Sequence, residues 1–207
     1  MPTIGVLALQ GDFREHCQRL RSIGVATREV RLPVHLDGLD GLVLPGGEST
    51  TIARLLQRFG LQEPLRERAR AGFPLWGTCA GAILLGDAVP GLDRTPLGLL
   101  PMAVERNAYG RQIDSFETDL DVPALGAKPF HAVFIRAPRI ADVGTGVEVL
   151  ARHEDDPVIV RRGPLLATTF HPELTSDVRL HHYFMTECVG AAESAAEARP
   201  TLAGGSH

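Results

Sequence analysis

Short apolar runs alternate with amphipathic stretches along the first half of the chain. The continuous apolar run at residues 4–9 is typical of a strand that is buried on both faces. Similar runs predict further strands at residues 25–32, 42–44 and 74–76. Helical spacing predicts helices at residues 13–23 and 80–85. It also predicts a helix from Ser49 or Thr50 to residue 59 and another helix that follows it to residue 71. This alternation favours a largely parallel sheet that is covered on both faces.

The second half of the chain predicts strands with little helix between them. They fall at residues 102–107, 115–118, 132–136, 148–151, 158–161 and 166–170. We expect an antiparallel extension together with closing strands of the same sheet, and a last helix at residues 179–189. Residues 191–207 are small and polar with almost nothing to bury, so we expect one domain at residues 1–190 and a disordered C-terminal tail at 191–207.

The composition is that of a globular protein. The chain has 207 residues, of which 44% are apolar, and this is enough for one domain with a sizeable core. The net charge of −4 includes no basic excess, which argues against a nucleic-acid partner. No apolar run approaches the length of a membrane span, and no basic leader precedes the first one. We therefore expect a soluble, cytoplasmic protein without a membrane partner.

The three cysteines are an odd number, and their spacing fits neither a zinc site nor a disulfide framework. Free thiols indicate a reducing compartment. Cys17 and Cys188 lie on predicted helices and are interpreted as packing residues. Cys79 differs, because it stands in Gly77-Thr78-Cys79-Ala80-Gly81 between a predicted strand and a predicted helix.

This Gly-x-Cys-x-Gly pattern is the cysteine version of a nucleophile elbow. A tight turn from strand to helix would raise the Cys79 side chain into the open, and small neighbours are needed because the turn crowds its own backbone. The helix start favours negative charge at the sulfur, and the amide of Ala80 would point at the same place, ready to hold an oxyanion. Taken alone, Cys79 could instead be a buried structural cysteine beside two packing glycines.

A thiolate nucleophile needs an acid–base partner, which is usually a histidine. Of the eight histidines, His171 follows a predicted strand and stands in His171-Pro172-Glu173. In extended backbone, residues i and i+2 point the same way, so Glu173 could fix the tautomer of the imidazole. The alternative is a histidine at a strand end beside a solvated glutamate.

A glycine-rich segment, Pro45-Gly46-Gly47-Glu48-Ser49-Thr50, follows the third predicted strand. Its glycines allow the backbone to approach a ligand closely, and a peptide at Gly47 could supply a second oxyanion donor opposite Ala80. The alternative is an ordinary turn that Ser49 or Thr50 caps. No Gly-Lys-Ser/Thr follows, so the segment is not a phosphate-binding loop.

Together these three segments resemble the class I, triad-type glutamine amidotransferase family. Further motifs narrow the resemblance to the glutaminase subunits of pyridoxal 5′-phosphate synthase, and they lie at residues 7–11, 76–81, 105–112, 134–138 and 171–175. The resemblance runs from about residue 3 to residue 190. It implies a flavodoxin-like α/β three-layer sandwich with a mixed, largely parallel central sheet. It also implies hydrolysis of L-glutamine through a glutamyl thioester, with the ammonia delivered to a ring-forming synthase subunit for vitamin B6 synthesis.

The resemblance also implies a role for individual residues. Cys79 would be the nucleophile, His171 the general acid–base and Glu173 its orienter. Gln10 would belong to the surface that contacts the synthase. The residues implied for glutamine binding are Gly47, Glu48, Ser49, Arg106, Ile135 and Arg136. The family's chemistry implies neither a metal nor an organic cofactor.

Alternatives to this function remain open from the sequence. The chain could serve another amidotransferase system, such as nucleotide, histidine or anthranilate synthesis. It could be a γ-glutamyl cysteine hydrolase on the same fold, or a non-catalytic subunit that retains an inherited site. The segment Asp12-Phe13 is more polar and bulkier than the small residues common in the family at this place.

Overall fold

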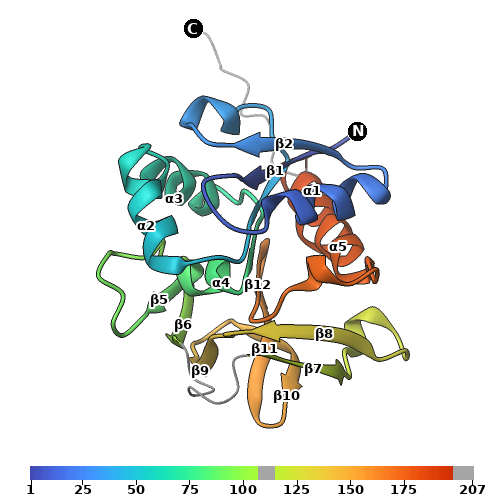
Figure 1. Ribbon diagram of the computed structural model, residues 1–207. Coiled ribbons are helices and arrows are strands. Elements are labelled where there is room, and N and C mark those ends of the chain that lie inside the picture. The colour runs from blue at the N-terminus through green and yellow to red at the C-terminus, as the bar shows by residue number, and fades with distance from the viewer. Residues whose placement is uncertain (107–114, 198–207) are drawn as a thin grey trace, which may run out of the picture.

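The computed structural model describes residues 1–106 and 115–197, and a seven-stranded sheet forms its centre (Figure 1). The strand order is β10-β11-β12-β4-β3-β1-β2. The bounds are β1 (Thr3–Leu7), β2 (Ala26–Val30), β3 (Gly41–Leu44), β4 (Leu75–Thr78), β10 (Glu148–His153), β11 (Asp156–Arg162) and β12 (Leu165–Thr168). Neighbours from β2 to β12 pair in parallel, whereas β11 and β10 are antiparallel. The predicted mixed, largely parallel sheet is therefore confirmed.

Each face of this sheet carries its own core, because strand side chains alternate between the faces. On β3, Leu42 and Leu44 pack into one core and Val43 packs into the other. Helices α2 (Ser49–Arg58), α3 (Gln62–Arg70) and α4 (Ala80–Leu85) cover the first face, and α1 (Phe13–Ser22) and α5 (Arg179–Tyr183) cover the second. Burying such a leucine or valine fully contributes about 1.5–3 kcal/mol. The result is the predicted three-layer sandwich.

The middle strands of the second half leave the central sheet. Strands β5 (Gly86–Ala88), β6 (Leu100–Glu105) and β9 (Arg139–Val143) form a small sheet, and β7 (Ser115–Leu120) pairs with β8 (Phe130–Ile135). The prediction that the later strands all extend the central sheet is wrong for β6, β7 and β8. On β8, buried and exposed residues alternate, so the strand has one apolar face and suits a one-sided layer. Its Phe134 ring packs 5.3 Å from that of Phe170.

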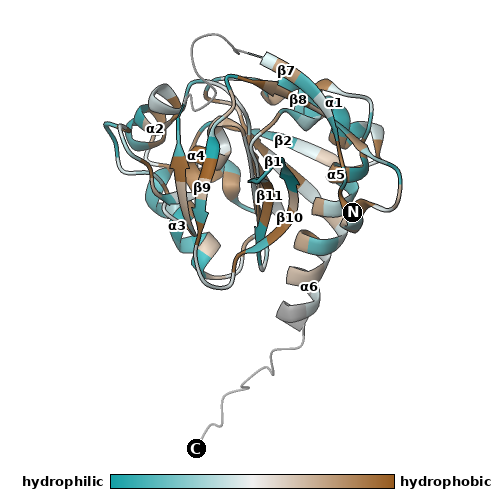
Figure 2. Cartoon of the chain, turned by 90° about the horizontal axis from the view of Figure 1, so that it is seen from below, coloured by the Kyte–Doolittle hydropathy of each residue, from teal (hydrophilic) through white to brown (hydrophobic). Residues whose placement is uncertain are grey.

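The C-terminal helix is longer than the sequence predicts. After α5 the chain continues through a π-helical segment, Phe184–Val189, into α6 (Gly190–Glu197), which extends away from the body (Figure 2). The expectation of disorder is thus wrong for residues 191–197, since alanine and glutamate propagate a helix that has already begun. Residues 198–207 lie outside the described residues. Within the described part of the chain, none of the helices has both the length and the apolar character that crossing a bilayer requires.

Four adjacent parallel strands, β12, β4, β3 and β1, end at the same edge of the sheet. Short 3₁₀ turns also follow strands, and they span Pro33–Leu36, Pro123–Leu125 and Pro172–Leu174. In open α/β sheets, ligands bind outside the carboxyl ends of such strands. The glycine-rich loop, the Cys79 turn and the His171 segment follow β3, β4 and β12, so they leave the sheet at this edge, whereas Arg106 and Arg136 follow β6 and β8 outside it.

Candidate active site

Cys79 occupies a strained turn between β4 and α4. Its φ is +48° and its ψ is −104°, a conformation that residues other than glycine rarely adopt. Its N–H donates to the carbonyl of Thr168 over 2.8 Å, which fixes the turn to the neighbouring strand β12. The Sγ atom donates to the carbonyl of Ile135 at 3.8 Å. This geometry is that of a nucleophile elbow, as the sequence predicts.

The two glycines around Cys79 are required by close backbone packing. A Cβ atom on Gly77 would lie 2.5 Å from the carbonyl oxygen of Gly81. A Cβ atom on Gly81 would lie 2.0 Å from the carbonyl oxygen of Leu44 on β3. Only glycine therefore lets the strand, the turn and the helix approach closely enough to form the elbow.

His171 follows β12 and lies beside Cys79 in the same cavity. Its Nδ1 is 2.8 Å from Oε1 of Glu173 and 3.4 Å from Oδ2 of Asp12. The backbone N–H of His171 donates to the carbonyl of Val133 on β8 over 2.9 Å. The backbone between His171 and Glu173 is a 3₁₀ turn, so the expectation of extended backbone there is wrong. The carboxylate still reaches the imidazole, because Glu173 turns back into the protein and is 1% exposed.

Electrostatics hold this pair in its charged form. Burial by itself lowers the pKa of His171, but hydrogen bonds with Asp12, Cys79 and Glu173 outweigh it and raise the pKa to about 12. For Glu173, burial opposes ionisation, yet the contacts with His16 and His171 hold the pKa of the carboxyl below its usual range. His171 therefore carries a proton at neutral pH, and Glu173 fixes the ring in one orientation.

The other two cysteines have no such surroundings. Cys17 and Cys188 are buried and carry free thiols. Burial raises the pKa of the Cys17 thiol, and it raises the pKa of Cys188 to about 12. Both side chains belong to the core under α1 and α5. Their predicted role in packing agrees with these positions.

The glycine-rich loop after β3 is tied to the end of β1. Glu48 donates its backbone N–H to Oε1 of Gln10 over 2.8 Å. Gly47 has a φ of +148°, which is the left-handed region. Glu48 also caps α2, because its Oε2 accepts from the N–H and the hydroxyl of Thr51, each at 3.1 Å. The predicted cap at Ser49 or Thr50 is thus wrong by one or two residues.

Gly46 lies directly against the imidazole of His171. A Cβ atom at this position would be 2.3 Å from Cε1 and 2.9 Å from Nδ1 of the ring. We therefore expect a Gly46→Ala variant to displace His171 and to lower kcat for the chemistry of this site about 100-fold or more. Steady-state kinetics check this, with Gly190→Ala as the control, because a Cβ atom on Gly190 makes only an ordinary contact of 3.5 Å with the carbonyl of Met185. Full activity of Gly46→Ala would contradict the described packing.

A cavity of about 410 Å³ opens above Cys79 and His171. All six residues that the sequence proposes for substrate binding line it, namely Gly47, Glu48, Ser49, Arg106, Ile135 and Arg136. The cavity also includes Asp12 and Ile83, which sequence reasoning did not select. Ala80 is buried beside the elbow. Gln10 does not line the cavity, and its Oε1 instead accepts a hydrogen bond from the backbone N–H of Glu48 in the glycine-rich loop.

The charges in this cavity fit an amino acid. Carboxylates of Glu48 and Asp12 could hold an ammonium group, and the guanidinium groups of Arg106 and Arg136 could hold a carboxylate. Arg106 donates to the carbonyl of Gly91 over 2.9 Å, and its Nη2 lies 3.5 Å from Oε1 of Glu48. The rest of the predicted Arg106 motif, residues 107–112, lies outside the described residues.

Asp12, His171 and Glu173 bring three potential metal ligands within 4.8 Å of one another. Their atoms are already paired, since the Nδ1 of His171 faces both carboxylates. The nitrogen of His171 that would bind an ion is therefore already occupied by contacts with these carboxylates.

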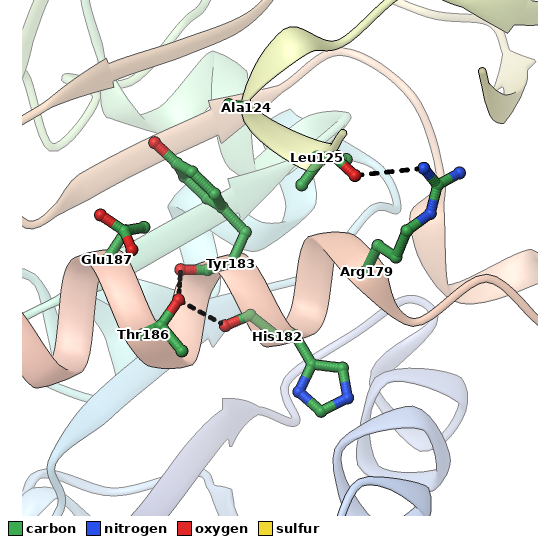
Figure 3. Close-up of a pocket in the computed structure, with 7 residues that line it drawn as sticks. All are labelled: Ala124, Leu125, Arg179, His182, Tyr183, Thr186 and Glu187. Carbon is green, nitrogen blue, oxygen red and sulfur yellow. Dashed lines mark hydrogen bonds between the residues drawn. The ribbon is translucent and has the colours of Figure 1, made fainter. Parts of the chain in front are cut away.

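A second hollow, of about 460 Å³, lies along α5 (Figure 3). Its Arg179 is held by Asp177 and by the carbonyls of Lys128 and Pro129. The hydroxyl of Thr186 donates to the carbonyl of His182. Among the described residues that line it there is no cysteine, and we assign no chemistry to it.

Comparisons with known proteins find relatives over most of the chain. Residues 6–190 match the model of the SNO glutamine amidotransferase family. The pyridoxal 5′-phosphate synthase subunit PdxT of Thermotoga neapolitana is 56% identical over 182 residues, which cover 88% of this chain and 97% of the relative. The PdxT subunit of Pelotomaculum thermopropionicum is 53% identical over 191 residues, or 92% of this chain and 97% of the relative.

Solved structures give the same result. A crystal structure of a glutamine amidotransferase matches with a TM-score of 0.85 and 53% identity, and the match covers 90% of this chain and 98% of the other. A structure of PurLQS from Thermotoga maritima shares the fold, with a TM-score of 0.68 and 16% identity over 89% of this chain and 98% of the other. The family match and the close relatives each span most of the chain, and so this protein belongs to the SNO glutamine amidotransferase family.

Proposed function

We propose that this protein hydrolyses L-glutamine to L-glutamate and ammonia, and that it delivers the ammonia to the synthase subunit of a pyridoxal 5′-phosphate synthase. The observation that carries the proposal is the arrangement of Cys79 on a strained elbow, beside a buried His171 that Glu173 orients at 2.8 Å. Family membership and the PdxT relatives support the substrate and the pathway. The free cysteines support a cytoplasmic location.

The proposed reaction begins when Cys79, as a thiolate whose proton is held on His171, attacks the side-chain amide carbon of glutamine. Backbone amides at Gly47 and Ala80 hold the oxyanion that forms, and one such donor contributes about 10²–10³ in rate. Protonated His171 gives its proton to the departing nitrogen, so ammonia leaves and a glutamyl thioester remains. His171 then takes a proton from water, whose oxygen attacks the thioester. The C–S bond breaks and glutamate is released, without a metal or an organic cofactor.

Substrate placement follows from the charges of the cavity. Glu48 is proposed to pair with the α-ammonium of glutamine, while Ser49 and Gly47 line the path of its side chain. Arg106 and the Ile135-Arg136 segment are proposed to hold the α-carboxylate end. This arrangement requires the free amino acid, because both charged groups of glutamine are recognised.

The proposed partner is the ring-forming synthase subunit, which builds pyridoxal 5′-phosphate from ribose 5-phosphate, glyceraldehyde 3-phosphate and the delivered ammonia. Gln10 is the proposed point at which this partner acts on the site. Its Oε1 holds the Glu48 amide, so any contact that moves Gln10 also moves the loop that carries the Gly47 oxyanion donor. Docking at Gln10 would thereby activate the glutaminase.

We expect glutamate release to rise when the protein is mixed with a synthase subunit, and we expect Gln10→Ala to reduce that rise about tenfold or more. Tenfold corresponds to about 1.4 kcal/mol, the value of one good interface contact. The assay measures glutamate release with and without the synthase. Gln57→Ala is the matched control, since Gln57 is exposed on α2 and lies away from the cavity. A normal rise for Gln10→Ala would remove Gln10 from the interface, and no rise for the wild type would refute the partner.

A further inference from the structure

A fully buried histidine on α1 lies directly behind the Cys79–His171–Glu173 triad. The Nε2 of His16 is 3.2 Å from Oε2 of Glu173 and 3.1 Å from Oγ1 of Thr78. Thr78 is the last residue of β4 and immediately precedes Cys79. A single imidazole therefore contacts both the orienting carboxylate and the strand that carries the nucleophile.

The position of the hydrogen on the His16 ring follows from its neighbours. Nε2 must carry a hydrogen, because a lone pair facing the Glu173 carboxylate would be repelled. The other nitrogen, Nδ1, has no hydrogen-bond partner among the residues that the structure describes. The ring packs edge-on against Trp76, with centroids 5.6 Å apart. A hydrogen on Nε2 suits this site, since a hydrogen on Nδ1 would be buried without an acceptor among the described residues.

Glu173 needs this contact. Its Oε1 pairs with His171, whereas its buried Oε2 accepts no aligned hydrogen bond from the described residues and has Nε2 of His16 beside it at 3.2 Å. The geometry at Nε2 of His16 favours Oγ1 of Thr78 as the acceptor of its hydrogen. Oε2 of Glu173 lies in close contact with the same nitrogen. One helical turn further along α1, the Nε–H of Arg19 donates to the backbone carbonyl of Glu173 over 3.0 Å. Helix α1 thus holds both the side chain and the backbone of Glu173.

We propose that His16 is a positioning residue for glutamine hydrolysis, whose Nε2–H is shared between Glu173 and Thr78 and so sets the carboxylate relative to the nucleophile elbow. This inference rests on the proposed function and adds a fourth side chain to the triad. His16 does not contact the substrate cavity, and it acts only through Glu173 and, beyond it, His171.

Other titratable groups surround this contact from several elements. Asp12 and Cys79 face His171 from the cavity side, and Arg19 lies beside Glu173 on α1. His181 on α5 has its ring 5.6 Å from that of His16, and burial lowers the pKa of His181 to about 3. Both nitrogens of His181 are without a partner in the described residues, so His181 packs against His16 without a hydrogen bond.

Three variants test the proposal. His16→Leu removes the donor, and we expect kcat to fall about tenfold to 100-fold, a part of the 10²–10⁴ that general acid–base catalysis supplies. KM should change less than about twofold, because the cavity is untouched. The acid limb of the kcat–pH profile should move to higher pH, since Glu173 loses a contact that favours its charged form. His16→Gln, whose amide can reach the Nε2 position, should recover most of the loss. His181→Leu, the packing control, should leave the pH profile in place.

Two results would overturn the inference. One is an unchanged pH profile and kcat for His16→Leu, and the other is an equal loss and an equal profile shift in His181→Leu, which would indicate packing alone. If His16→Leu does not fold, His16→Gln is compared with His16→Asn, whose shorter amide cannot reach Glu173. Equal activity and pH profiles of these two polar variants would also refute the role. Absence of glutaminase activity in the wild type would refute the proposed function itself, so the two failures are distinguishable.

Discussion

Replacing Cys79 by alanine is expected to abolish glutamate release, with kcat lowered by about 10⁴-fold or more. The thiol supplies the bond that divides amide hydrolysis into two easier steps, and no other cysteine lines the described part of the cavity. Release of glutamate from glutamine, measured at saturating substrate in the presence of the synthase subunit, checks the expectation. Alanine fits the elbow because it is smaller than cysteine and retains the backbone bond to Thr168.

The matched controls for this variant are Cys17→Ala and Cys188→Ala. Both thiols are buried in the core beneath α1 and α5, so these changes should lower stability and leave kcat almost unchanged. Glutamate production by Cys79→Ala at the wild-type rate would contradict the assignment of the nucleophile. A loss of activity in all three variants, with loss of the folded state, would indicate damage to the fold and not to the chemistry.

Replacing His171 by glutamine is expected to lower kcat by about 10³–10⁴-fold, because the ring supplies both the proton for the departing ammonia and the base for water. The thermal stability of the variant should also depend on pH differently from that of the wild type. The pKa of His171 is raised in the folded state, so its ion pairs stabilise the fold fully below the ordinary histidine value. They are lost as the pH rises toward about 12. The difference in Tm between wild type and His171→Gln should therefore shrink from about pH 6 to about pH 10.

Thermal unfolding across this pH range and steady-state kinetics provide the two measurements. His153→Gln is the control, because His153 lies on β10, outside the cavity. A Tm difference that grows as the pH rises would contradict a protonated, paired His171. Wild-type kcat in His171→Gln would remove the histidine from the mechanism.

Much of this fold and site could be predicted from the sequence. The apolar runs locate β1, β3, β4 and β12, because a strand that is buried on both faces consists almost entirely of apolar residues. The Gly-x-Cys-x-Gly spacing predicts the elbow, since Gly77 and Gly81 are needed by the backbone itself. The interval between His171 and Glu173 predicts their contact even though the local backbone is a turn and not extended.

Other features depend on contacts between distant segments, which periodicity does not reveal. Asp12 and His16 belong to no chemical motif, and only the packing of α1 against the end of β12 brings them to His171 and Glu173. The separate pairing of β7 with β8 depends on which face of β8 meets the core through Phe134. The sequence also did not predict that Glu48 caps α2, because serine and threonine are the usual capping residues and both follow Glu48 directly.

The most direct test of the central claim is to follow nitrogen from glutamine into pyridoxal 5′-phosphate. The protein is mixed with the synthase subunit, ribose 5-phosphate, glyceraldehyde 3-phosphate and glutamine labelled with ¹⁵N at the side-chain amide, and excess unlabelled ammonium is added. The account predicts pyridoxal 5′-phosphate that carries ¹⁵N in its ring in spite of the unlabelled ammonium, and no label when Cys79→Ala replaces the wild type. Unlabelled product from both proteins would contradict delivery of glutamine nitrogen by this chain.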